Sequence, residues 1–143
     1  MLRKTINNDF SKETNREIIM WLNTVLNKNM KTDDDLIVLL KDGVILCEVA
    51  KQLLNINSKL PHKSTSAFFC MENIEFFIKA VRNADVPDQY NFKTVDLWEE
   101  KNIRQVQLAI IAFSRAMNKK NKNIPVIGPQ EKEYEKKDIF IDE

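Results

Sequence analysis

The apolar residues in the first part of this chain recur at helical spacing. Between about residues 14 and 27 they follow one another at i, i+3, i+4, i+7 and i+8, which places them on one face of a helix. They are Ile18, Trp21, Leu22, Val25 and Leu26. Thr14, followed three residues later by Glu17, has the form of a capping box and predicts where this helix begins.

Two more stripes with this spacing predict two further long helices. The first stripe contains Leu46, Val49, Ala50, Leu53 and Leu54, and the second contains Ile74, Phe77, Ile78 and Val81. Pro87 should stop the latter helix, because proline disfavours helical geometry in the residue before it. Residues 57–66 have no period and predict a surface loop. Short helical turns are expected at 36–40, capped by the aspartates of 33–35, and at 95–98.

The last predicted helix, at about residues 103–119, carries apolar residues around most of its circumference. They are Val106, Leu108, Ala109, Ile110, Ile111, Ala112, Phe113, Ala116 and Met117. A helix of this kind is buried or carries an interface, so we expect it at the centre of the fold, with its remaining exposed strip available to a partner. After Lys120 the pattern gives way to a charged segment interrupted by Pro125, Gly128 and Pro129, which we expect to be flexible.

The composition supports an all-α fold. Only 2 Gly and 4 Pro interrupt the chain, and 43% hydrophobic residues suffice for the core of one domain. The formal net charge of +1 gives no strong field to attract nucleic acid, and no run approaches the roughly 20 apolar residues of a membrane span. We therefore expect neither nucleic-acid binding nor membrane insertion. Cys47 and Cys70 lack CxxC spacing, which favours reduced thiols in a cytoplasmic protein.

Residues that carry familiar catalytic or metal chemistry are scarce. His62 is the only histidine, so a Ser-His-Asp or Cys-His site would depend on a residue of the polar loop. Gly43 and Gly128 stand too far apart to form a phosphate-binding loop. The three aspartates of 33–35 lack the central Gly and distal Glu of a calcium-binding EF-hand loop. We therefore expect no enzyme activity, no metal and no cofactor.

The segment Leu40-Lys41-Asp42-Gly43-Val44-Ile45-Leu46-Cys47-Glu48 closely resembles the Lys-Asp-Gly-Leu/Ile-Leu-Cys signature of calponin homology domains. Three further blocks fall in the order of that family: Trp21-Leu22, then Met71-Glu72-Asn73-Ile74-Glu75-Phe76-Phe77-Ile78-Lys79-Ala80, then Asp96-Leu97-Trp98-Glu99 followed by Arg104-Gln105-Val106-Gln107. The resemblance covers about residues 15–119 and is nearest to the single-domain calponin and transgelin type. It implies an all-α calponin homology fold, with four main helices plus short connecting helices around a central, buried C-terminal helix.

On this basis the chain divides into three parts. Residues 1–14 are an N-terminal extension, residues 15–120 the calponin homology domain, and residues 121–143 a charged, flexible tail. In the tail, residues 126–131 and 134–140 are similar to the Gly-Pro-Lys segment, with charged residues and Phe, that follows the domain in transgelin-like proteins. The calponin repeat itself is not recognisable in this sequence.

The signature residues of the resemblance are expected to be structural. They are Trp21, Lys41, Asp42, Gly43, Leu46, Cys47, Asn73, Ile74, Phe77, Asp96, Leu97 and Val106. Within this set, Asp42 can cap a helix, Gly43 can admit close approach of another backbone, and Leu46 with Cys47 can pack in the core.

Partner contacts, by resemblance to actin-binding members, are expected on strips of the first and last helices that lie outside their core stripes. The candidates are Met20, Asn23, Thr24, Lys28, Gln105, Leu108, Ile111, Ala112, Arg115 and Lys119. An apolar centre flanked by polar and basic groups suits a protein interface. The alternative that Leu108 and Ile111 belong to the core stays open.

The resemblance implies a non-catalytic protein that binds filamentous actin, with filament bundling as an open question, located in the cytoplasm at the actin cytoskeleton or cell cortex. The alternative is a signalling or scaffold domain that contacts kinases or exchange-factor domains and has little affinity for actin. The missing calponin repeat and the near-zero net charge favour that alternative. Microtubule binding, known among more distant relatives, usually goes with a strongly basic surface and is not expected here.

Overall fold

The computed structural model describes residues 2–128, with side chains from residue 12 onward, and this part of the chain forms helices and no strands. The helices are α1 (Leu2–Leu26), α2 (Leu36–Leu40), α3 (Val44–Leu54), α4 (Ala67–Asn83), the short 3-10 helix η1 (Asp88–Tyr90), α5 (Thr94–Trp98) and α6 (Ile103–Lys120). The all-α class predicted from the sequence is confirmed.

The helix ends follow the local signals that the sequence contains. Asp35 caps α2, since its carboxylate accepts the backbone N–H of Ile37 at 2.9 Å. Helix α3 ends before Asn55, which adopts a left-handed conformation with φ 54°. Helix α4 ends at Asn83, before Pro87, as the proline predicted.

The start of α1 differs from the prediction. The helix begins at Leu2, and Thr14 lies inside it with only 7% of its surface exposed, so the capping box proposed for Thr14 and Glu17 is wrong. A capping box works only where the preceding residues leave the helix. Residues 2–13 contain no Gly or Pro to end a helix, and the helix therefore extends through the segment that we expected as an N-terminal extension.

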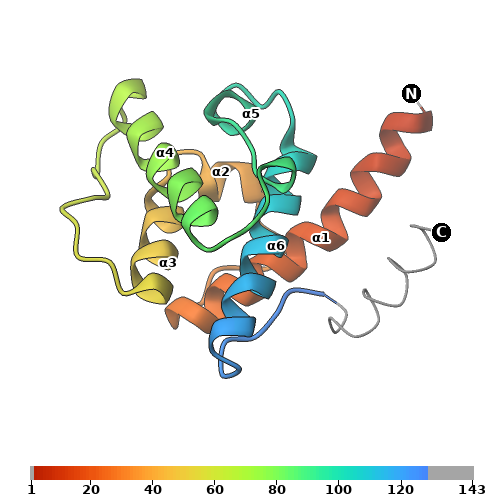
Figure 1. Ribbon diagram of the computed structural model, residues 1–143. Coiled ribbons are helices and arrows are strands. Elements are labelled where there is room, and N and C mark those ends of the chain that lie inside the picture. The colour runs from red at the N-terminus through yellow and green to blue at the C-terminus, as the bar shows by residue number, and fades with distance from the viewer. Residues whose placement is uncertain (1, 129–143) are drawn as a thin grey trace.

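Helix α6 passes through the middle of the molecule, with α3 and α4 to one side of it and α1 packed behind it (Figure 1). The apolar residues of its buried face are Val106, Ala109, Ile110, Phe113 and Met117, and Gln107 and Ser114 are buried beside them. The ring of Phe113 meets that of Phe77 from α4 edge-on, with centroids 5.3 Å apart, a favourable arrangement for two aromatic side chains. The predicted central position of the last helix is confirmed.

Gly43 and Asn73 connect the turn between α2 and α3 to α4. Gly43 has φ +76°, a left-handed conformation. The buried amide of Asn73 donates to the backbone oxygens of Asp42 and His62 at 2.9 Å each, and accepts the backbone N–H of His62 at 2.8 Å. One side chain therefore holds both the α2–α3 turn and the loop of residues 57–66 against α4.

The other signature residues also occupy structural positions. The side chains of Trp21, Leu46, Ile74, Phe77, Leu97 and Val106 are buried. The carboxylates of Asp42 and Asp96 each accept a backbone N–H at the start of a helix, at 3.0 and 2.8 Å. Lys41 forms an ion pair with Glu100, with Nζ and Oε2 3.1 Å apart. These contacts hold the helices and turns of the domain together.

Residues 121–128, which we call the strap, lie against the domain although we expected them to be part of a flexible tail. The indole N–H of Trp21 donates to the carbonyl oxygen of Pro125 at 2.6 Å, and the N–H of Ile127 donates to Ser114 Oγ at 3.1 Å. The side chain of Ile127 is buried in the core. Residues 129–143 lie outside the described residues, so for them flexibility stays a prediction.

Cys47 should react slowly with thiol reagents in the folded protein. Its buried Sγ donates to the carbonyl oxygen of Asn73 at 3.2 Å, and burial raises the pKa of the thiol from 9.0 to about 12. At pH 8 we expect a rate roughly a thousandfold below that of the unfolded chain, because the reactive thiolate is rare. The rate can be measured with a disulfide reagent on a Cys70→Ser variant, with and without denaturant. Equal rates in both conditions would contradict the prediction.

Candidate partner-binding surface

The four candidates on and after α1 have different environments. Met20 exposes 52% of its surface, and Thr24 is exposed one turn later. Asn23 instead holds the loop that follows α1, since its side chain donates to the carbonyl oxygen of Met30 at 2.8 Å and accepts the N–H of the same residue at 2.9 Å. Lys28 pairs with a carboxylate of α3 at 3.6 Å. Met20 and Thr24 are therefore the candidates of α1 that offer open surface.

The strap borders this face of α1. Met20 and Thr24 line a shallow hollow of about 230 Å³ together with Trp21 and with residues 125–128 of the strap. The hydrogen bond from Trp21 to Pro125 fixes the strap beside the helix. The candidate surface on α1 is therefore formed by two segments that lie far apart in the sequence.

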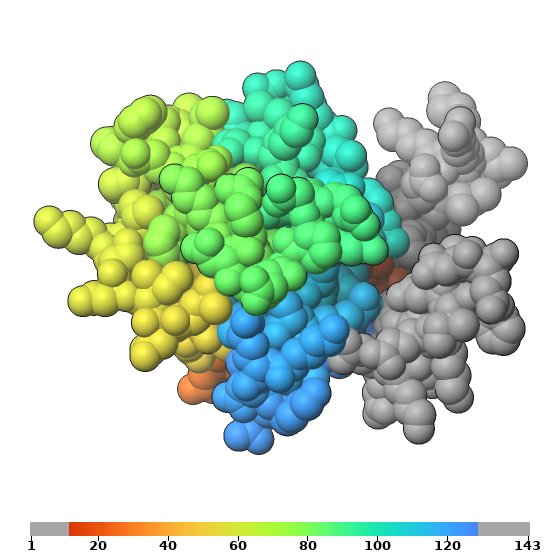
Figure 2. Space-filling view, in the orientation of Figure 1, coloured from red at the N-terminus to blue at the C-terminus, as the bar shows by residue number. Residues whose placement is uncertain are grey.

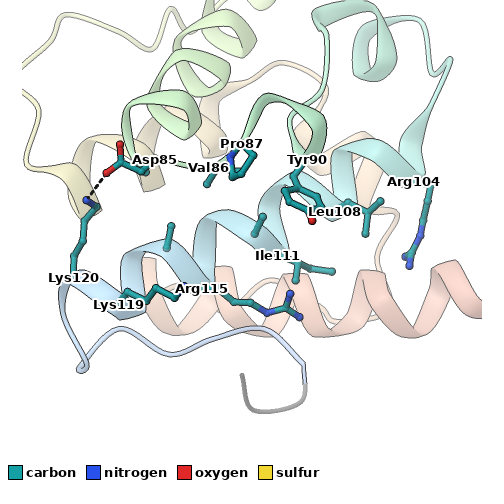
Figure 3. Close-up of a pocket in the computed structure, with 13 residues that line it drawn as sticks. Asp85, Val86, Pro87, Tyr90, Arg104, Leu108, Ile111, Arg115, Lys119 and Lys120 are labelled. Atoms are coloured by element: carbon teal, nitrogen blue, oxygen red, sulfur yellow. Dashed lines mark hydrogen bonds and ion pairs between the residues drawn. The ribbon is translucent and has the colours of Figure 1, made fainter. Parts of the chain in front are cut away.

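The candidates on α6 line a larger groove of about 740 Å³ (Figure 3). Figure 3 shows Ile111 on α6 below Pro87 and Tyr90, which come from the segment between α4 and α5, and Leu108 on α6 beside Tyr90. Ala112 and Ala116 also belong to the apolar part of the α6 wall. No described residue of α1 lines this groove, so the structure does not bring the α1 and α6 candidates into one site.

Five of the six candidates on α6 belong to the groove lining, and Gln105 does not. The side-chain amide of Gln105 donates to the backbone oxygens of Gln89 and Asn91 at 3.1 and 2.9 Å, so it holds the η1 segment onto α6. Ile111 packs partly against the core, whereas Leu108 is half-buried and faces the groove. The alternative interpretation, in which Leu108 and Ile111 are core residues, therefore holds in part for Ile111 and not for Leu108.

Basic side chains surround the apolar part of the groove. Arg104 lies toward one end, and Arg115, Lys119 and Lys120 lie toward the other (Figure 3). Among the described residues of the lining, Asp85 is the one acidic residue, and its carboxylate pairs with Lys120 at 3.4 Å. The groove therefore combines an apolar floor with a rim of positive charge, even though the net charge of the chain is only +1.

The second wall of the groove was not predicted from the sequence. We interpreted residues 85–88 only as the end of α4, yet Val86 is buried and Tyr90 exposes 46% of its surface beside α6. Figure 2 shows this face, with the segment that follows α4 above the C-terminal half of α6. The sequence signal for this wall is weak, because Val86 and Tyr90 lie in a short segment without helical period. Such a segment does not indicate where it packs relative to α6.

The described residues contain no group of three or more His, Cys, Asp and Glu side chains that could hold a metal ion. His62 contacts Glu72, with Nε2 and Oε1 2.7 Å apart, and is not part of the groove lining. Among the helices of residues 2–128, none has the length and apolar character to cross a membrane. The arrangement of the groove is suited to binding a protein surface.

Comparison with known proteins agrees with the fold. The family model of the calponin homology (CH) domain matches residues 12–119. Transgelin of Saccharomyces cerevisiae is 33% identical over 135 residues, which cover 90% of this chain and 68% of that protein. Transgelin of Schizosaccharomyces pombe is 36% identical over 106 residues, which cover 73% of this chain and 60% of that protein. The chain therefore spans about two thirds of the length of these two relatives.

A solved structure gives the same result at lower sequence identity. The calponin homology domain of an IQGAP protein from Schizosaccharomyces pombe superposes with a TM-score of 0.69 at 21% identity, covering 82% of this chain and 76% of that one. Because the family model covers most of the sequence and transgelins are similar along most of its length, this chain belongs to the calponin homology domain family and is of the transgelin type.

Proposed function

We propose that this protein binds filamentous actin through the groove on α6 and the exposed residues of α1, as a non-catalytic protein of the actin cytoskeleton. The observation that carries the proposal is the groove, which places open apolar surface inside a basic rim on the helix that the family resemblance indicated. An apolar centre with a polar rim is the usual composition of a protein interface. Such a protein acts in the cytoplasm, along actin filaments or at the cell cortex.

Co-sedimentation with filamentous actin tests the proposal. In the double variant Leu108→Asp/Lys119→Glu we expect the Kd to rise about tenfold or more, because loss of one central contact of an interface costs upwards of about 1.4 kcal/mol. Binding by the parent chain should weaken as salt rises from 50 to 200 mM, since salt screens the basic rim.

A matched control changes the same chemistry at other positions. Val38 exposes 71% of its surface on α2, Lys59 is exposed in the loop after α3, and neither residue lines the groove. The variant Val38→Asp/Lys59→Glu should bind actin like the parent chain, with both double variants keeping a helical melting transition. Equal loss of binding in the two double variants would remove the groove as the contact.

The competing function is a signalling or scaffold domain with little affinity for actin. It predicts that the parent chain does not sediment with filaments even at low salt. It also predicts that affinity capture from cell extract returns kinases or exchange-factor proteins with actin depleted. If the parent chain sediments with filaments and the variant Leu108→Asp/Lys119→Glu binds them more weakly, actin binding is the better supported function.

A further inference from the structure

The groove has the chemistry to accept a short apolar segment flanked by carboxylates, and the sequence of this chain contains one. Residues 138–143 read Asp-Ile-Phe-Ile-Asp-Glu, with three apolar residues between acidic ones and no basic residue. We propose that this segment, which we call the acidic segment, binds in the groove of the same molecule.

The charges of the two partners are complementary. Of the described residues that line the groove, four are basic and one, Asp85, is acidic; Asp85 forms an ion pair with Lys120. The acidic segment carries three carboxylates and no cation. Its apolar centre matches the apolar walls formed by Leu108, Ile111 and Tyr90. Complementary charge at the rim fixes orientation, while burial of the apolar centre supplies most of the affinity.

The strap holds the chain against α6 before the acidic segment begins. The N–H of Ile127 donates a hydrogen bond to Ser114 on α6. The next residue of that helix, Arg115, lines the groove. From Gly128 to Asp138 the chain can span roughly 33 Å, whereas a helix of the length of α6 measures about 27 Å. Every part of the groove therefore lies within reach. A short connection also gives a high effective concentration, of millimolar order, so that weak contacts suffice for binding.

Binding of the acidic segment would place it on the surface proposed for actin. A filament that uses the groove must then displace the segment, so that removal of its apolar centre should raise the affinity for actin. The expected rise in actin affinity rests on the proposed function, whereas binding of the acidic segment to the groove does not. The experiment that tests binding of the acidic segment therefore contains no actin.

Paramagnetic broadening in the full chain tests the contact. A spin label on a Lys137→Cys variant stands next to the acidic segment, and Cys47 and Cys70 are buried, so that the label reacts with the new thiol. We expect the amide signals of Leu108 and Ile111 to lose more than half of their intensity. Signals of the loop near Lys59, which is not part of the groove lining, should keep theirs.

Two variants identify the contact that causes the broadening. Phe140→Ser removes the largest apolar group of the acidic segment and should restore the signals of Leu108 and Ile111. Tyr134→Ser makes a similar change outside the segment and should leave the broadening in place. Absence of broadening, or broadening that survives Phe140→Ser, overturns the proposal. A mixture of spin-labelled chain and isotope-labelled chain without a spin label should show no broadening. Broadening in that mixture would mean that the acidic segment binds the groove of a second copy, which overturns binding within one molecule.

Discussion

Replacement of Gly43 by alanine should lower the melting temperature by roughly 10 °C. An added Cβ would lie 2.5 Å from the Cβ of Asn73 and 2.8 Å from the backbone nitrogen of Ile74, both on the rigid helix α4. The left-handed conformation costs a non-glycine residue about 1–2 kcal/mol, and overpacking costs about 1–3 kcal/mol more. The expected loss of about 3 kcal/mol corresponds to that temperature shift in a domain of this size. Thermal unfolding followed by circular dichroism measures it.

The other described glycine provides a matched control. Gly128 has nearly the same conformation, with φ +77° against +76° for Gly43, but Gly128 is exposed whereas Gly43 is buried against α4. Gly128→Ala should therefore cost only about 1–2 kcal/mol, the backbone part of the effect. If the two variants melt at the same temperature, close approach of α3 and α4 is not the reason for glycine at position 43.

The sequence predicted the helices well because each of them buries one face. Core packing imposes a 3.6-residue period on any amphipathic helix. This period was visible for α3 and α6 within a few residues of their observed ends, and for α4 from Ile74 to Val81, although that helix begins at Ala67. It was less informative at the start of α1, because the core stripe begins at Ile18 while the helix continues toward Leu2. Periodicity reports which residues are buried, and a helix that extends beyond the core leaves no such signal.

The surfaces that bind partners were harder to predict. The strap has no period, and its order depends on single contacts such as that from Trp21 to Pro125, which lie 104 residues apart in the sequence. The groove likewise forms between α6 and the segment around Tyr90. The candidates on α6 therefore indicated one wall of the groove but not the groove itself. Gln105 and Asn23 look like surface residues by spacing, yet each forms hydrogen bonds to a backbone loop. Such contacts depend on tertiary structure, which a local pattern does not contain.

Replacement of Asn73 by alanine should destabilise the domain by about 3 kcal/mol or more. The variant loses three hydrogen bonds and leaves the Asp42 carbonyl and both backbone groups of His62 without their partner. Each polar group left unsatisfied costs about 1–3 kcal/mol when it is buried, and entry of water reduces that cost. Urea unfolding should show the loss. Asn118→Ala, which removes one bond to the carbonyl oxygen of Ile124, should cost about 1 kcal/mol.

A second readout separates the specific role of Asn73 from general loss of packing. Because the amide ties residue 62 to α4, the loop of residues 57–66 should become mobile before the domain unfolds, and trypsin should cleave after Lys59 or Lys63 faster than in Asn118→Ala. Asn73→Asp tests the donors alone: a carboxylate keeps the shape and the acceptor but cannot donate to the two carbonyl oxygens. Burial should raise the pKa of that carboxyl, so its ionised form opposes folding and its deficit should shrink as the pH falls from 7 toward 4. If Asn73→Asp shows no deficit at pH 7, the side-chain volume of Asn73, and not its donated hydrogen bonds, stabilises the loop.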